Sequence, residues 1–89
     1  MAKPLANEGK LRALVREVLA MAPGYALEDE QLFAAVRELL PMHSAQDSDI
    51  LRAAEWNLGK DYVTDAKNED TDNREWRISK DGLAKQSIK

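Results

Sequence analysis

The sequence predicts a single small α+β domain in which three helices are followed by a two-stranded β-hairpin. Apolar residues recur at three- and four-residue spacing through residues 8–59, which is the pattern of amphipathic helices. The period then changes to two in residues 61–65 and 75–79, which indicates strands. A chain of 89 residues without an internal repeat or a linker is long enough for one domain with a thin core.

Each expected helix has one apolar stripe and a residue that ends it. We place the helices at about Glu8–Ala22, at about Glu28–Leu40, and from shortly after Ser44, where Ser44 and Asp47 resemble a capping pair, to Gly59. They end at Pro23-Gly24, Pro41 and Gly59. The stripes consist of Leu11, Leu14, Val15, Val18 and Leu19, of Leu32, Phe33, Val36, Leu39 and Leu40, and of Ile50, Leu51, Ala54 and Leu58. The second and third helices, joined by a tight turn, have helix-turn-helix geometry.

The hairpin is expected to consist of the strands Asp61–Asp65 and Glu75–Ser79, both rich in β-branched and aromatic residues. A polar segment, residues 66–74, joins them as a long solvated turn. Trp76 and Ile78 share one face of the second strand, because side chains alternate between the faces of a strand. We therefore expect this pair to cover the helical core.

Two fragments resemble the winged helix-turn-helix superfamily: LGKDYV at residues 58–63 and WRISKDGLA at residues 76–84. The resemblance covers about residues 8–85 and implies a three-helix helix-turn-helix core with a C-terminal two-stranded β-hairpin wing. It also implies that the Ser79 hydroxyl caps a final helical turn and that Gly82 relaxes the backbone there. Residues 1–7 and 86–89 are expected to be flexible ends.

The first functional hypothesis is DNA association, as a transcriptional regulator or a phage or prophage accessory factor. In such domains the third helix enters the major groove and the wing contacts the DNA backbone. The corresponding residues are Ser44, Gln46, Ser48 and Arg52 on the third helix, with Lys60, Arg74 and Arg77 as backbone anchors. Because one module this small makes few phosphate contacts, we expect useful affinity to require a homodimer or a larger complex.

The alternative hypothesis is a protein-interaction adaptor that has the same fold and does not bind DNA. Residues 28–74 contain twelve acids and five bases, and acids oppose binding to phosphates. Trp56 is expected to point away from the apolar stripe, so either the hairpin covers it or it marks a contact surface. The interacting residues would be Trp56, Asp49, Glu69, Asp70 and Asp72.

Basic residues gather near the two ends of the chain, and they suggest a third functional hypothesis. They are Lys3, Lys10, Arg12, Arg16, Lys80, Lys85 and Lys89. If they lie together, they form a positive patch that binds phosphates through an unusual face of the fold. The alternative is that they only keep the surface solvated.

Catalysis and metal binding have little support in the sequence. His43 is the only histidine and is expected to be a partly buried turn residue, and no cysteine, glycine-rich phosphate loop or paired base for a serine occurs. A calcium-binding loop that starts at Asn68 would need glycine at its sixth position and glutamate at its twelfth. The residues there are Asn73 and Ser79, so the pattern does not fit. We therefore expect no enzyme activity, cofactor or metal, and the lack of an 18-residue apolar run predicts a cytoplasmic chain without a membrane span.

Overall fold

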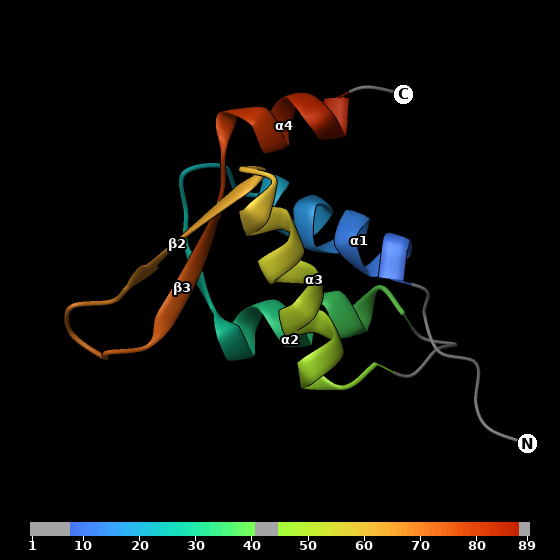
Figure 1. The fold of residues 1–89 in the computed structure, drawn as a ribbon. Helices are drawn as coiled ribbons and strands as arrows, with labels where there is room; N and C mark the ends of the chain where they lie inside the picture. Colours follow the sequence, from blue (N-terminus) through green and yellow to red (C-terminus); the bar gives the residue numbers. More distant parts are fainter. Residues whose placement is uncertain (1–7, 41–44, 88–89) are drawn as a thin grey trace, which may run out of the picture.

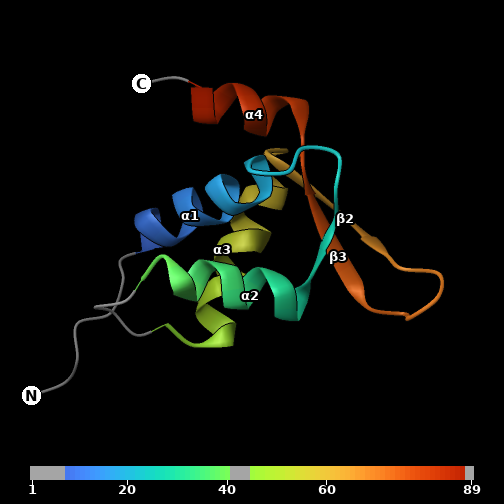
Figure 2. The ribbon, with the colours of Figure 1, turned by 180° about the vertical axis from the view of Figure 1, so that it is seen from behind.

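The computed structural model describes residues 8–40 and 45–87, and the α+β class is confirmed (Figure 1). The elements are α1 (Glu8–Ala20), β1 (Leu27–Glu28), α2 (Asp29–Glu38), α3 (Asp47–Gly59), β2 (Val63–Lys67), β3 (Arg74–Ile78) and α4 (Lys80–Ser87). The hairpin of β2 and β3 projects from one side of the helices, and α4 lies across α1, as the view from behind also shows (Figure 2). Residues 1–7, 41–44 and 88–89 lie outside the described residues, and of the predicted flexible end 86–89 the structure describes residues 86 and 87 as part of α4.

The sheet has three antiparallel strands in the order β1-β3-β2, not the two strands of a simple hairpin. β1 is only two residues long, so it has no alternating pattern that the sequence would reveal. It is defined by its pairing with β3, in which Leu27 lies opposite Trp76. β3 is therefore the central strand.

The predicted hairpin is confirmed, with small shifts in its bounds. β2 begins at Val63 and not at Asp61, because Asp61 adopts a positive φ of 62° and the Tyr62 amide donates to the Asn57 carbonyl oxygen. Trp76 and Ile78 are buried against the helices, as their shared face predicts. Val63 lies opposite Ile78 and is also fully buried.

The buried stripe of α3 differs from the predicted one. The buried residues are Ile50, Ala53, Ala54 and Asn57, whereas Leu51 and Leu58 are only partly buried. The reason is that α1 packs closely on α3, so the small side chains of two alanines and one asparagine lie at the contact. The two leucines flank this contact on the same helix.

The helix ends also correct the sequence reading. α1 ends at Ala20, before the exposed Met21, and the chain turns at Gly24 with a φ of +89°. The cap of α3 is Gln46, whose amide donates to the Asp49 carboxylate at 3.0 Å. The expected capping residue, Ser44, lies outside the described residues.

The expected final helical turn is a full helix, α4, which continues to Ser87 beyond the expected domain end at residue 85. The Ser79 hydroxyl accepts a hydrogen bond from the Gly82 amide at 2.9 Å, so its predicted capping role is confirmed. Gly82 is required for a different reason from the expected one. A Cβ there would lie 1.9 Å from the Tyr62 carbonyl oxygen, so glycine permits close packing of α4 on this segment.

Candidate functional site

The residues expected to read DNA from α3 do not form a positive surface. Ser48 and Gln46 are exposed near the start of α3. Arg52 is exposed, but its guanidinium lies 3.0 Å from an oxygen of Asp49 and 3.6 Å from one of Glu8. Ser44 and the single histidine, His43, lie outside the described residues.

The expected backbone anchors on the hairpin are engaged within the protein. Arg74 lies 2.9 Å from a carboxylate oxygen of Asp65 and 3.5 Å from one of Glu55, and its guanidinium stacks over the ring of Trp76. Arg77 donates to the Gly24 carbonyl oxygen at 3.0 Å. These arginines hold the hairpin against its neighbours.

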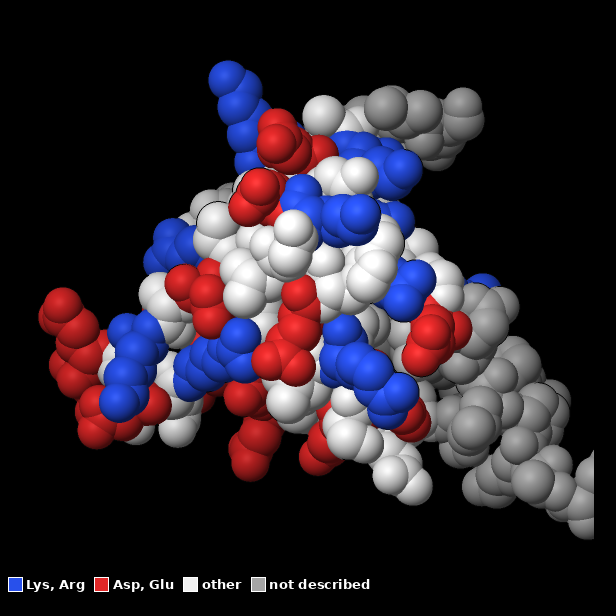
Figure 3. All heavy atoms as spheres, viewed as in Figure 1, with Lys and Arg blue, Asp and Glu red and all other residues white. Residues whose placement is uncertain are grey.

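The expected interaction residues of the hairpin turn are exposed and acidic. Glu69, Asp70 and Asp72 lie in the turn between β2 and β3, where red side chains gather at the tip of the hairpin (Figure 3). Lys67 lies 3.9 Å from Asp72. Residues 47–59 and 63–78 together, which we call the α3–hairpin surface, contain eight acids and four bases.

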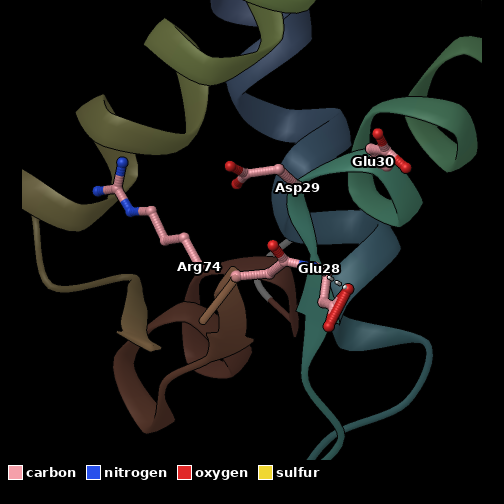
Figure 4. A pocket seen from close by; sticks show the side chains of 5 residues that line it. Glu28, Asp29, Glu30 and Arg74 are labelled. Atoms are coloured by element: carbon pink, nitrogen blue, oxygen red, sulfur yellow. Dashed lines mark hydrogen bonds between the residues drawn. The ribbon is translucent and has the colours of Figure 1, made fainter. Parts of the chain in front are cut away.

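A hollow lies beside this surface, where β1 meets α2 opposite the start of β3 (Figure 4). Its lining residues are Glu28, Asp29, Glu30, Asn73 and Arg74. The Asp29 carboxylate accepts a hydrogen bond from the Trp76 indole at 2.6 Å, and Glu28 accepts one from Asn73 at 3.1 Å. Two of the three carboxylates are therefore structural, and no group of acids, histidines or cysteines within the described ranges is placed to hold a metal ion.

A second surface, of different chemistry, lies where α1, the end of α3 and α4 meet. Two aromatic rings, Trp56 and Tyr62, lie with their centroids 6.2 Å apart. Four cations surround them: Arg12 at 4.5 Å and Lys60 at 5.5 Å from the Trp56 ring, and Arg16 at 5.5 Å and Lys85 at 5.9 Å from the Tyr62 ring. We call these six residues the cation–aromatic cluster. Its cations come from three separate parts of the chain.

Arg16 lies at the base of the cluster and is only 8% exposed. Its guanidinium donates to the side-chain oxygens of Asn57 and Gln86, both at 2.9 Å. Burial lowers the pKa of the Arg16 guanidinium from its usual value, and the nearby Tyr62 opposes part of this decrease. The partners are neutral amides, so the positive charge of Arg16 is solvated but not cancelled.

The ring and cation contacts of Trp56 come from α1 and from the segment that leads to β2, not from the hairpin strands, and its role as a contact surface stays a prediction. The ring is half-buried between Arg12 of α1, Lys60 and Tyr62, and Tyr62 precedes the hairpin strand. Of the basic ends of the chain, Arg12, Arg16 and Lys85 come together here, whereas Lys3 and Lys89 lie outside the described residues. Tyr62 and Asn57 were missed by the sequence reading. Asn57 had a signal, because it is seven residues after Ile50 and three after Ala54 on the buried stripe.

The fold and these contacts define a small α+β domain with two chemically distinct surfaces. No family model, curated protein or solved structure matches the chain. None of the helices within the described ranges has the length and apolar character needed to cross a membrane.

Proposed function

We propose that this chain is a winged-helix domain that acts as a protein-interaction adaptor for a basic partner. The element order supports the fold assignment: α1, β1, α2 and α3 are followed by the β2–β3 hairpin. This is the order of helices and wing that the resemblance of residues 58–63 and 76–84 to the superfamily implies. A fold hosts many functions, so the proposed role depends on the surface chemistry.

The observation that carries the proposal is the charge of the α3–hairpin surface. Its acids outnumber its bases eight to four. Three of the bases, Arg52, Lys67 and Arg74, have a carboxylate oxygen within 3.9 Å, and the fourth, Arg77, is bound to a carbonyl oxygen. Phosphate binding needs cations that are available to the phosphates, so this surface favours a basic partner over DNA.

The hairpin turn offers the most accessible carboxylates of this surface. Glu69 and Asp70 are exposed, and among the described residues neither has an ion pair with a cation. Glu30, at the rim of the hollow, is also exposed. Lysine and arginine side chains of a partner would pair with these carboxylates, which steers the partner to the hairpin side of the molecule.

A labelled octa-arginine peptide, titrated at low salt and followed by fluorescence anisotropy, tests the proposal. The Glu69→Gln/Asp70→Asn variant should weaken binding severalfold, because it removes two unpaired carboxylates. The matched control is Glu17→Gln/Glu38→Gln, which removes two exposed carboxylates from α1 and α2. Equal weakening by both variants, or none by the first, would contradict a specific acidic surface.

DNA association through α3 and the hairpin remains the second candidate, because the element order favours it. It predicts that binding of a duplex DNA falls when Arg52 is changed to Gln. It also predicts that binding is insensitive to Lys85→Gln, because Lys85 lies on α4. That pair of results would favour α3 as the reading element and would overturn the adaptor proposal.

A further inference from the structure

The two surfaces differ in how their cations are compensated. On the α3–hairpin surface, Arg52, Lys67 and Arg74 are paired with carboxylates. In the cation–aromatic cluster, Arg12 alone has a carboxylate oxygen within 4 Å among the described residues, that of Glu8 at 3.6 Å. Within the described part of the chain, the other three cations of the cluster therefore have no carboxylate oxygen within 4 Å.

The aromatic rings hold these cations without cancelling their charge. A cation over a ring face is attracted by the ring quadrupole, which restrains the side chain but adds no negative charge. Arg12 and Lys60 are held in this way by Trp56, and Lys85 by Tyr62. A ligand that meets restrained cations loses less conformational entropy on binding than one that must order free lysine side chains.

The buried guanidinium of Arg16 adds a positive electrostatic potential that would attract an anion to the cluster. Arginine is rarely buried to this extent unless it is paired. Here its hydrogen-bond partners are the neutral side chains of Asn57 and Gln86. Coulomb interactions are stronger near the low-dielectric interior, so an anion at the cluster would gain more from Arg16 than from a fully solvated arginine.

We infer that the cation–aromatic cluster binds the phosphate backbone of nucleic acid without reading its base sequence. The cations come from α1, from Lys60 directly after α3 and from α4, and Figure 3 shows blue side chains over this part of the molecule with red side chains among them. An extended set of cations suits a polymer with regularly spaced phosphates better than a single small anion. The site goes beyond the proposed adaptor role, because its cations all lie outside the α3–hairpin surface, with which it shares Trp56 alone, and because it takes a different partner.

The test uses the full chain with a fluorescein-labelled duplex of 20 base pairs and one of its single strands. We expect both to bind with dissociation constants of roughly 10⁻⁴–10⁻⁶ M at physiological salt and more tightly as salt is lowered. Lys60→Gln/Lys85→Gln should weaken binding about tenfold or more and reduce the slope of log K against log salt by about two, one per lost phosphate contact. Both lysines are exposed, so circular dichroism should show an unchanged fold.

The matched control is Lys67→Gln/Arg77→Gln, which removes two exposed cations from the hairpin. It should leave the affinity within about twofold, because these cations are held by Asp72 and the Gly24 carbonyl oxygen. A control that weakens binding as much as the cluster variant would overturn the inference, as would no binding of either DNA at low salt. These outcomes are separate from those of the octa-arginine titration, which reports on the acidic surface.

Discussion

Asn57 is fully buried and joins α3 to α1 through hydrogen bonds. Its side-chain nitrogen donates to the Arg12 carbonyl oxygen at 3.1 Å and to that of Ala53 at 2.9 Å, and its side-chain oxygen accepts from Arg16. Its own carbonyl oxygen accepts from the Tyr62 amide. One polar residue therefore positions both arginines of the cluster and the turn that leads to β2.

Asn57→Ala should lower the free energy of unfolding by about 2–3 kcal/mol, because it leaves a buried N–H of Arg16 without its partner and removes the side-chain bond to the Arg12 carbonyl that joins α3 to α1. Urea denaturation measures the change. The control, Ser48→Ala, alters an exposed residue of the same helix and should change the free energy by less than about 0.5 kcal/mol. Equal values for the two variants would show that the Asn57 bonds are not important for stability.

Gly82 lies where α4 packs closely on Tyr62, in the segment before β2. Gly82→Ala should lower the free energy of unfolding by about 1–3 kcal/mol, because the added methyl group would collide with the Tyr62 carbonyl and the Ile78 side chain. Gly59→Ala is the matched control, since nothing lies within 4 Å of its added Cβ. That variant should be neutral or more stable by about 0.5–1 kcal/mol, because alanine favours the helix. A thermal melt that ranks the two variants in the opposite order would contradict the close packing.

At the scale of elements, the hairpin turn is tied to the start of α2. The Glu28 carboxylate accepts hydrogen bonds from Thr71 at 3.2 Å and from Asn73 at 3.1 Å. Within the turn, Asn68 accepts from the amides of Asp70 and Thr71. The acidic turn is thus held in place by its own side chains and by β1, and it presents its carboxylates from a defined position.

Glu28→Ala should increase amide hydrogen exchange in residues 69–73 severalfold, because two bonds that hold the turn are lost. The amides of the β2–β3 ladder should keep their protection. Glu30→Ala, at the exposed neighbouring position, serves as the control and should leave the turn unchanged. Unchanged exchange in the Glu28 variant would mean that contacts within the turn, such as those of Asn68 and Thr71, are sufficient to order it.

At the scale of the whole molecule, α1 joins all parts of the fold. It contacts α2, α3, α4 and β3, and its apolar stripe is the largest contribution of any helix to the core. The two tryptophans lie in different regions of the molecule. Trp76, on β3, is fully buried in the core, and Trp56 lies in the cation–aromatic cluster. A molecule connected in this way is expected to unfold as one unit.

This expectation can be checked with Trp56→Phe, which leaves Trp76 as the only tryptophan. Fluorescence of Trp76 and far-ultraviolet circular dichroism of the helices should give the same denaturation midpoint. A fluorescence transition at lower urea than the helical one would indicate that the sheet opens before the helices.

Much of the fold was predictable because its signals are local. The apolar stripe of α1 and the face of Trp76 and Ile78 follow from periodicity alone, and the structure confirms them. In the predicted stripe of α2, by contrast, Leu39 is exposed, because the helix ends at Glu38. β1 was not predictable, because two residues become a strand only by pairing with β3. Leu51 and Leu58 were assigned to the core by their apolar character, whereas the close approach of α1 placed Asn57 there.

The charged surfaces, like the fold, have features that the sequence determines and features that depend on tertiary packing. The sequence by itself determined that the hairpin turn is acidic and that basic residues gather near the chain ends, because charge is a property of each residue. Only the tertiary structure decided which charges are cancelled. Arg16 meets Asn57 across 41 residues and Gln86 across 70, and such contacts depend on how α1, α3 and α4 pack together.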